Sequence, residues 1–559
     1  MKRFEYFIIL LLSLVILFLS FYPIYYRYKT TPPDRTYVGT TFYTADYAGY
    51  VSTIEQGIKG RWTYVDKFTT EKLSETFLYY PYLLIGHIAG FLGIGSIWAY
   101  HLSRFLLGLI YLVSIYWLIA VIFSDRNRHS GESSEARRIQ NQDSGQARMT
   151  GSMISSIKRI IAFFLVLFSS SFPSKLSSIV AETQVVNRFV IQPHFLLGNI
   201  FLILGIILFL KYLEKPEKKY VILSGLMVFL VTVFRPSHVI LYLATIGIYV
   251  IVSTLASFWG GSASWRRRLQ NHLRTDSGQA RMTMRQYFIF FLTSLVFSLP
   301  GFFYLWYLKS NFNELPYFLY DGEGKNLFNL WDLVLLQGPM LLLAVSLFFR
   351  HSGKSGILLS FVAANVVLLF VLPKIYPLNP LRFLQTPLFA ILAILATEAI
   401  FKLAKNLSLI TLMFLITVTF SLPTLWLDFD HEVHLYVDAY YIWPPKEYLP
   451  ALKFLESSSK PQDAVLTYKS LSNLVPMISG NTIYWGHTNE TLNYNQKQIM
   501  VEKFYKGLMS DQEAQEFLKS NNIKYILVGR EEKALGNFHY EFLKKDFANL
   551  ELELYNSEL

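Results

Sequence analysis

The stretch 7-FIILLLSLVILFLSF-21 contains no charged residue and lies within a longer, mostly apolar segment, 4–26. A helix needs about 20 predominantly apolar residues to cross the hydrocarbon core of a bilayer, so this segment predicts a transmembrane helix. No small-x-small cleavage site follows it, and we interpret it as a retained anchor rather than a signal peptide. Because Lys2 and Arg3 precede the segment, we predict a cytoplasmic N-terminus.

Similar apolar segments recur as far as residue 427. Of the 559 residues, 53% are hydrophobic, 17% aromatic and only 16% charged, whereas soluble domains carry about 25% charged residues. We therefore predict a mainly α fold, a polytopic transmembrane helical bundle. The predicted spans number about eleven: 4–26, 98–123, 159–176, 194–213, 220–236, 239–258, 287–308, 331–349, 356–372, 384–401 and 407–427.

The segment 77-FLYYPYLLIGHIAGFLGIG-95 is nearly long enough to cross, and its placement decides the side of every later loop. If it stays on the outer surface, most Lys and Arg residues of the later loops lie inside, in agreement with the positive-inside rule. Pro81 and several glycines also interrupt it. We therefore predict an outer-surface helix here and place the C-terminus outside.

Charge and cysteine content exclude several classes of function. The net charge of +12 comes largely from basic residues in short loops between apolar segments, which indicates membrane topology and no nucleic-acid partner. The chain has no cysteine, which excludes disulfides, thiolate metal sites and cysteine nucleophiles. A multi-pass protein of the plasma (inner) membrane fits these features.

The octapeptide DSGQARMT occurs twice, at 143–150 and 276–283, in polar loops that the topology places inside. A docking motif is one interpretation. The other, which we prefer, is a duplicated insertion in tolerant loops, with residues 127–156 and 262–284 poorly ordered.

The composition changes after Trp426, and 428–559 is polar and mixed. DAVLTY (463–468) and KYILVG (524–529) have the character of short strands, and Ser510 followed by Glu513 forms a capping-box pattern. Strands that alternate with helices predict a small extracytoplasmic α/β domain over 428–559, following a transmembrane module over 1–427.

The first outer loop, 27–97, is long for a connection between helices, and long ordered loops tend to be functional. Within it, Asp46, Tyr50, Thr53 and Gly57 recur at the spacing of one helix face. Asp46 lies among aromatic residues close to the predicted membrane surface. A carboxylate in such surroundings is a candidate general base, because desolvation makes it more basic.

Three stretches of this region resemble the GT-C superfamily of polytopic glycosyltransferases, which use polyprenyl-phosphate sugars. ADYAGYVSTIEQGIKGRW (45–62) resembles the first-loop acidic motif of its bacterial protein O-mannosyltransferase and aminoarabinose transferase group. YYPYLLIGHIAGFLGI (79–94), followed by WAYHLSRFLLGLIYL (98–112), resembles their surface helix and next span. The outer segment 181–202 is also similar. Where the mannosyltransferases have a paired Asp-Glu, this chain has Asp46-Tyr47.

The resemblance implies that Asp46 is the catalytic base, which deprotonates an acceptor hydroxyl that attacks and inverts the sugar C1. The leaving group is a lipid phosphate, which needs cations at the outer membrane face. The candidates, in order, are Arg382 in YPLNPLRFLQTP (376–387), Arg235 in VFRPSH and Arg104. For each, the alternative is an interfacial arginine that only extends toward the membrane surface.

Other polar residues are candidates for the same cavity. Glu182 is a second catalytic carboxylate or a solvated acid, and Tyr50, His87 and His194 are acceptor or cavity contacts or structural residues. Asp46, Glu182 and His194 together are a possible site for a divalent metal such as Mg²⁺ or Mn²⁺. In the C-terminal domain, His487, with Trp485 and Tyr494, is a candidate to stack on a sugar or cover the lipid-facing cavity. The alternative is a plain surface loop.

The leading hypothesis is therefore an inverting glycosyltransferase. It would move a sugar from a polyprenyl-phosphate donor, a membrane lipid, to a protein, lipid or glycan acceptor at the outer face of the membrane. A membrane transporter or lipid flippase is the alternative, and it would place ionisable residues in mid-span and show inverted repeats. A non-catalytic scaffold or receptor is a third possibility.

Overall fold

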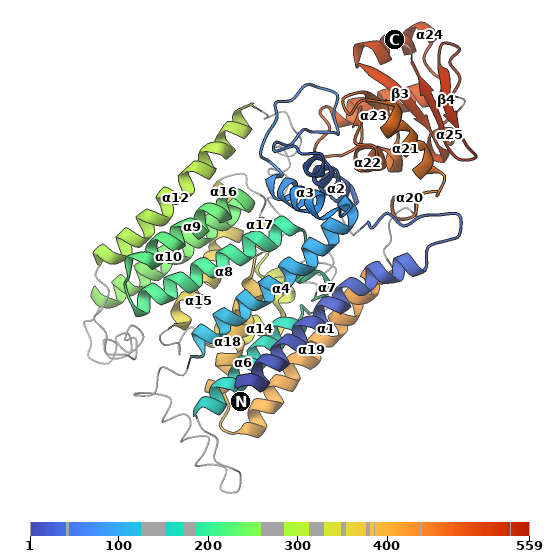
Figure 1. Cartoon of the computed structure of the whole chain (residues 1–559). Helices are drawn as coiled ribbons and strands as arrows, with labels where there is room; N and C mark the ends of the chain where they lie inside the picture. Colours follow the sequence, from blue (N-terminus) through green and yellow to red (C-terminus); the bar gives the residue numbers. More distant parts are fainter. Residues whose placement is uncertain are drawn as a thin grey trace. The chain divides into compact units, whose positions relative to one another are not determined.

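We describe the protein from a computed structural model. The described residues are 2–40, 44–124, 151–172, 185–258, 284–311, 329–347, 354–375, 379, 381–384, 386–434, 439–536 and 538–557. Both copies of DSGQARMT lie outside them. The described chain forms two compact units (Figure 1). The first contains 2–21, 104–308 and the described part of 321–431, and the second contains 22–103, 309–311 and 432–557.

The first unit is helical, and four of its helices (α1, α4, α12 and α19) also contribute residues to the second unit. The helices are α1 (Lys2–Lys29), α4 (Ser96–Ile122), α6 (Gly151–Phe168), α7 (Val185–Arg188), α8 (Pro193–Glu214), α9 (Lys218–Phe234), α10 (Pro236–Phe258), α12 (Met284–Asn311), α14 (Leu330–Val345), α15 (Ser355–Phe370), α16 (Leu372–Ile375), α17 (Leu381–Leu384), α18 (Leu388–Leu403) and α19 (Leu407–Val433).

Each predicted span overlaps one of these helices, which confirms the helical membrane bundle. Among the described residues, seven helices are long and apolar enough to cross a membrane: Arg3–Lys29, Ser96–Ile122, Pro193–Glu214, Pro236–Leu255, Met284–Asn311, Ser355–Ile375 and Leu407–Val433. The helix within 77–95 has only 13 residues and is not among them. The chain is thus a multi-pass membrane protein, and its orientation stays a prediction.

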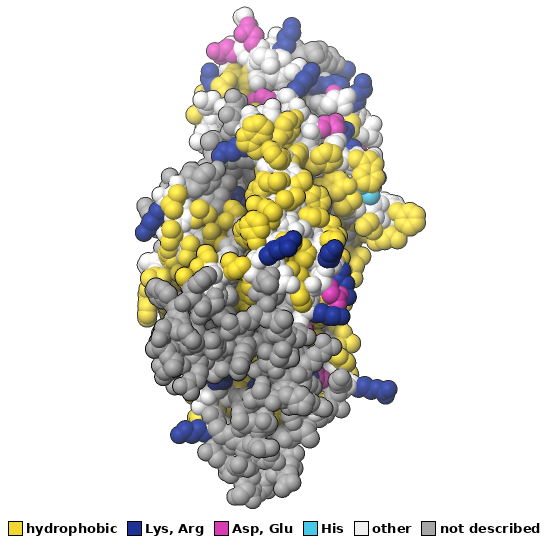
Figure 2. All heavy atoms as spheres, turned by 90° about the vertical axis from the view of Figure 1, so that its left-hand side faces the viewer, with side chains coloured by type: hydrophobic (Ala, Val, Ile, Leu, Met, Phe, Trp, Pro, Cys, Tyr) yellow, Lys and Arg dark blue, Asp and Glu magenta, His cyan; other side chains and the backbone are white. Residues whose placement is uncertain are grey.

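Close helix packing and an apolar exterior characterise the first unit. Helices α8, α9 and α10 lie side by side (Figure 1). On α12, large side chains remain exposed, among them Phe303 at 66% and Trp306 at 69%. Hydrophobic side chains also gather on the face drawn in Figure 2. Exposed apolar side chains on such helices are expected where the surrounding solvent is lipid.

One buried ion pair joins three helices of the first unit. Arg159 of α6 donates from Nε to Glu5 Oε1 of α1 over 2.6 Å and from Nη2 to Glu5 Oε2 over 2.9 Å. Ser156 donates to the same carboxylate over 2.9 Å, and Tyr116 of α4 donates to it as well. Because a buried charge is tolerated only when it is paired and hydrogen-bonded, this network holds the ends of α1, α4 and α6 together.

The second unit combines two helices of the first outer loop with an α/β domain. Its elements are α2 (Thr44–Ile58), α3 (Tyr80–Leu92), α20 (Ala439–Ile442), α21 (Tyr448–Ser458), β1 (Ala464–Leu466), α22 (Lys469–Ile478), β2 (Thr482–Ile483), α23 (Tyr494–Tyr505), α24 (Asp511–Ser520), β3 (Ile523–Val528), α25 (Arg530–Lys533), β4 (Lys544–Ala548) and β5 (Glu553–Asn556). The predicted α/β domain is present, and so is the capping box of Ser510 and Glu513.

The sheet has the order β2-β1-β3-β5-β4, in which β2, β1 and β3 are parallel and β5 is antiparallel to both β3 and β4. Side chains alternate along β3, because successive residues of a strand point to opposite faces. Tyr525 and Leu527 share a core with α21 and α22, whereas Ile526 and Val528 share one with α23 and α24.

Helix α2 of the first loop belongs to the first of these two cores. Its residues Tyr47, Val51 and Ile54 pack in the same apolar cluster as Leu471 and Leu474 of α22. The first outer loop, which the sequence analysis grouped with the transmembrane module, is thus one compact unit with the C-terminal domain. The reason is that the apolar face of α2 is covered by α22.

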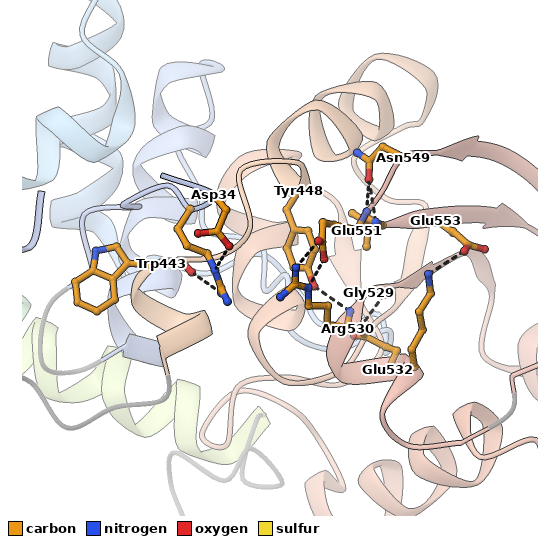
Figure 3. A network of polar contacts seen from close by, with 12 residues as sticks. Asp34, Trp443, Tyr448, Gly529, Arg530, Glu532, Asn549, Glu551 and Glu553 are labelled. Carbon is orange, nitrogen blue, oxygen red and sulfur yellow. Dashed lines mark hydrogen bonds and ion pairs between the residues drawn. The ribbon is translucent and has the colours of Figure 1, made fainter. Parts of the chain in front are cut away.

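A polar network connects several segments of the α/β domain (Figure 3). Arg530 pairs with Glu551 through both Nε and Nη2, and its backbone N–H donates to Tyr448 Oη over 3.1 Å. Glu532 accepts the Gly529 N–H over 3.0 Å, and the Asn549 side chain accepts the Glu551 and Leu552 N–H groups. Side chains thereby satisfy backbone donors at two turns.

Two glycines allow α2 and α3 to touch through their backbones. A Cβ on Gly86 would lie 2.2 Å from the Ile54 carbonyl oxygen, and a Cβ on Gly57 would lie 2.3 Å from the Leu83 carbonyl oxygen. Both are closer than any real Cβ approaches backbone. Of the predicted face, Tyr50 and Gly57 therefore contact α3.

We expect Gly86→Ala to destabilise the second unit, because the added methyl would force α2 and α3 apart, at a cost of roughly 1–3 kcal/mol. The measurement is the midpoint of thermal denaturation of the detergent-purified protein. Gly95→Ala is the matched control, because a Cβ on Gly95 meets nothing within 4 Å. Equal midpoints for Gly86→Ala and the wild type would contradict the close packing.

Candidate functional site

Asp46 lies in the first turn of α2. A carboxylate is favourable there because the helix dipole places partial positive charge at the N-terminus. The sequence led us to expect a desolvated carboxylate, but the Asp46 side chain is 36% exposed. Its position at the start of the helix leaves it open on one side, while the residues from Tyr47 to Ile54 turn into the core.

His487 of the C-terminal domain faces Asp46. Its side chain is only 2% exposed, and its Nε2 lies 3.2 Å from Asp46 Oδ1. The backbone N–H of Asn489 donates to the other ring nitrogen, Nδ1, over 3.1 Å. Because Nδ1 accepts a hydrogen bond, the proton of the neutral ring lies on Nε2, the nitrogen nearer to Asp46. The 3.2 Å approach of Nε2 to Asp46 Oδ1 is an ion-pair contact and not an aligned hydrogen bond.

Glu490 is the second acid beside His487, and Oε1 lies 3.9 Å from His487 Nε2. It is buried and accepts hydrogen bonds from two tyrosines of the first loop, Tyr64 over 2.6 Å and Tyr79 over 2.9 Å. Asp66, also from the first loop, accepts the backbone N–H of Phe68 over 2.7 Å. The first loop and the C-terminal domain therefore share one polar cluster.

The charges in this cluster act on one another. Burial lowers the pKa of His487, but the negative charges of Glu490 and Asp46 outweigh it, so the pKa lies above its usual value. Burial, and after it the charge of Glu490, raises the pKa of Asp66 well above the ordinary range. A protonated imidazole beside several acids reduces the repulsion between their negative charges.

Tyr50, predicted to line a cavity, is buried in a group of tyrosines. Its ring stacks on Tyr82 with centroids 4.3 Å apart and meets Tyr79 edge-on at 5.8 Å. His87 of α3 stacks on Trp62 at 3.9 Å. Trp485, proposed to stack on a sugar, is buried between Tyr468 and Tyr494. All of these rings contact protein neighbours.

In the first unit, three of the predicted residues gather at the N-terminal end of α8. The charges of Arg235 and Arg382 both act on the half-buried ring of His194. Arg235 ends α9, and its guanidinium lies 3.5 Å from the centre of the Phe195 ring. A Cβ on Gly198 would lie 2.6 Å from Arg235 Cβ, so this glycine makes room for the arginine stem.

Two further residues extend this basic cluster, and the sequence analysis did not single them out. His238 of α10 lies with Nε2 2.8 Å from Asn199 Oδ1 of α8, and both side chains are buried. The charge of Arg235 also acts on the buried ring of His238. Their signal in the sequence was weak, because a lone histidine or asparagine in an apolar segment is most often structural.

Arg104, the third candidate for the donor phosphate, contacts the backbone of a neighbouring segment. It is buried in α4, and its Nε donates to the backbone carbonyl of Val190. Its neighbour Arg188 donates to the carbonyls of Val166 and Ser169, each over 3.1 Å. These arginines hold the segment that leads into α8, so they position the basic cluster through the backbone.

A metal site finds no support among the described residues, which contain no group of three or more His, Asp or Glu side chains placed to hold an ion. Glu182, the predicted second carboxylate, lies outside the described residues. Asp46 and His194 belong to different units.

No protein-family model matches this sequence, and no curated protein sequence matches it. Solved structures do match in fold. The oligosaccharyltransferase AglB from Archaeoglobus fulgidus, in complex with an inhibitory peptide and a dolichol-phosphate, aligns with a TM-score of 0.54 at 12% identity, over 94% of this chain and 70% of that one. The arabinofuranosyltransferase AftD from Mycobacteria aligns with a TM-score of 0.50 at 12% identity, over 100% of this chain and 40% of that one.

ArnT from Cupriavidus metallidurans bound to undecaprenyl phosphate also aligns, with a TM-score of 0.45 at 12% identity, over 98% of this chain and 97% of that one. At such low identity the similarity concerns the fold. The fold is similar to that of AglB and AftD, in agreement with the resemblance noted in the sequence.

We expect Glu490→Leu to lower the thermal midpoint of the purified protein, because it removes the acceptor of the buried Tyr64 hydroxyl, at roughly 1–3 kcal/mol, and one hydrogen bond of the half-buried Tyr79. Adding Tyr64→Phe and Tyr79→Phe should restore much of the loss, since removing both partners of a hydrogen bond is nearly neutral. Glu541→Leu, at an exposed position, is the control. A triple variant less stable than Glu490→Leu alone would argue against this arrangement.

Proposed function

We propose that this protein is an inverting glycosyltransferase that moves a sugar from a polyprenyl-phosphate donor to an acceptor hydroxyl at the outer face of the membrane. The observation that carries the proposal is Asp46. It is a partly exposed carboxylate at the start of a first-loop helix, and it faces a histidine in a chain with the GT-C fold. An exposed edge gives an acceptor access, and a buried imidazole keeps the carboxylate in place.

In the proposed reaction, Asp46 accepts the proton of the acceptor hydroxyl as the oxygen attacks C1 of the sugar. The new bond from oxygen to C1 forms on the face opposite the phosphate, and the bond from C1 to the phosphate oxygen breaks. The phosphate leaves with the electron pair as polyprenyl phosphate, so the configuration at C1 inverts. The base is needed because a hydroxyl is a weak nucleophile at neutral pH.

The donor phosphate needs positive charge, because its own charge grows as the sugar leaves. We assign this role to Arg235 and Arg382, with His194 beside them. A guanidinium offers paired N–H donors whose geometry matches phosphate oxygens. The dolichol-phosphate bound in the AglB structure supports a polyprenyl-phosphate donor for this chain too. Arg104, which donates to a backbone carbonyl, supports the site indirectly.

The partners follow from this chemistry. The donor is a lipid of the bilayer in which the helices lie, and the acceptor carries a hydroxyl, whether on a protein, a lipid or a glycan. We place the reaction at the plasma (inner) membrane, with the N-terminus cytoplasmic and the C-terminal domain outside. No step of the proposal requires Mg²⁺ or Mn²⁺.

We expect Asp46→Asn to reduce sugar transfer about 10²- to 10⁴-fold, because an amide has no basic oxygen to take the proton. The measurement is transfer from a panel of radiolabelled polyprenyl-phosphate sugars in membranes, at matched expression. Asp34→Asn is the control, an exposed acid of the same loop that pairs with Arg35. Full activity of Asp46→Asn would move the base elsewhere. If no donor reacts but labelled lipid moves across the membrane of vesicles that contain the protein, the transporter or flippase hypothesis is favoured.

We expect Arg235→Gln and Arg382→Gln each to reduce kcat/KM for the donor by about 10²-fold or more, while the KM for the acceptor stays the same. The physical reason is loss of charge where the leaving phosphate develops its own. Arg285→Gln, at an exposed position at the start of α12, is the matched control. Equal changes in the KM for the acceptor and the KM for the donor would contradict the assignment of these arginines to the donor phosphate.

A further inference from the structure

The polar cluster in the second unit contains more than the base requires. The proposed reaction asks only for one carboxylate with an exposed edge. The structure adds a buried imidazole from the C-terminal domain, a backbone amide that fixes its tautomer, and a second buried acid held by two tyrosines. Each of these groups costs free energy to bury, so the arrangement calls for a role.

The turn that carries His487 is held rigidly. The His487 carbonyl accepts the N–H groups of Glu490 over 3.2 Å and Thr491 over 2.9 Å, so His487 and Glu490 lie on one side of the turn. Thr491 Oγ1 in turn donates to the Phe68 carbonyl over 2.7 Å. The Phe68 ring meets the imidazole edge-on, with centroids 5.2 Å apart.

The neighbouring first-loop segment is tied to the same turn region. The Ile483 N–H donates to the Lys67 carbonyl over 2.9 Å, and Lys497 donates to Thr69 over 3.1 Å and to Glu71 over 2.7 Å. The imidazole is therefore fixed from two sides, by its own turn and by residues 67–71. The Asp46 side chain lies beside the buried imidazole and is itself 36% exposed.

We propose that His487 is the positioning residue for Asp46: its Nε2–H fixes one carboxylate oxygen, so that the other faces the acceptor hydroxyl. This inference rests on the proposed function, in which Asp46 is the base. A carboxylate at a helix start has several rotamers of similar energy, and a misplacement of about 1 Å can cost about 10²-fold in rate. A fixed donor removes that freedom. The C-terminal domain thus contributes directly to the geometry of the base.

The titratable groups that face His487 are Asp46 of α2, Asp66 of the first loop and Glu490 of its own turn, with Tyr64 and Tyr79 bound to Glu490. Their negative charges favour the imidazolium, whereas the Asn489 N–H at Nδ1 opposes it, because a second ring proton would displace that hydrogen bond. Removing the charge of Asp46 therefore lowers the pKa of His487.

The first test is kinetic, in membranes with the donor that reacts. We expect His487→Leu to lower kcat about 10- to 100-fold with little change in either KM, because binding is intact but the base is misplaced. His487→Gln should recover most of kcat, since the glutamine amide places an N–H donor near the position of Nε2. A merely structural histidine predicts instead that both variants lose activity in step with their thermal midpoints.

The second test needs no activity. The protein has 11 histidines, and in the ¹⁵N-histidine spectrum the signal that His487→Gln removes belongs to His487. We expect this signal to show the tautomer with the proton on Nε2, and its pKa to fall in Asp46→Asn but not in Asp34→Asn. The opposite tautomer, or a pKa that Asp46→Asn leaves unchanged, overturns the proposal even if His487→Leu fails to fold.

The two hypotheses fail in different ways. If Asp46→Asn abolishes transfer while His487→Leu transfers sugar at the wild-type rate, the positioning role is wrong and the proposed function stands. If Asp46→Asn transfers sugar at the wild-type rate, Asp46 is not the base, and the positioning role falls with it. Loss of sugar transfer in both Asp46→Asn and His487→Leu, with recovery in His487→Gln, supports both the proposed function and the positioning role.

Discussion

The arrangement of the candidate site depends on one apolar contact, the packing of α2 against α22 of the C-terminal domain. Ten of the 15 residues of α2 are buried, and full burial of residues such as Val51 and Ile54 stabilises the contact by about 1.5–3 kcal/mol each. Because the core holds α2 in one orientation, its first turn ends beside His487. Loss of this contact would remove the support that places Asp46 beside His487.

The polar cluster beside this core shows how buried charges are tolerated. Glu490 is bound by two tyrosines and lies near a histidine whose pKa is raised, so no buried charge of this group stands alone. In the first unit, the Arg235 guanidinium lies over an aromatic ring and its stem fills the space left by a glycine. Buried charge in both units is thus matched by rings, hydrogen bonds and opposite charge.

The similarity in fold at 12% identity has a physical explanation. A membrane helix requires only apolar side chains of the right length, because its backbone hydrogen bonds are satisfied internally. Many sequences meet this condition, so the helical plan survives extensive change. The chemistry resides in a few loop and helix-end positions, such as Asp46 and Arg235, where substitution is far less free.

The sequence by itself determined the membrane bundle and the α/β domain, because hydrophobic length and periodicity are local properties. It also singled out Asp46, Arg235, Arg382, His194 and His487 by residue type and position. Only the tertiary structure decided which of these meet. It paired Asp46 with His487 and gathered Arg235 and Arg382 around His194, while Tyr50 entered a core and Arg104 bound a backbone carbonyl. Contacts between residues hundreds of positions apart depend on how apolar faces pack, and no local pattern in the chain records that.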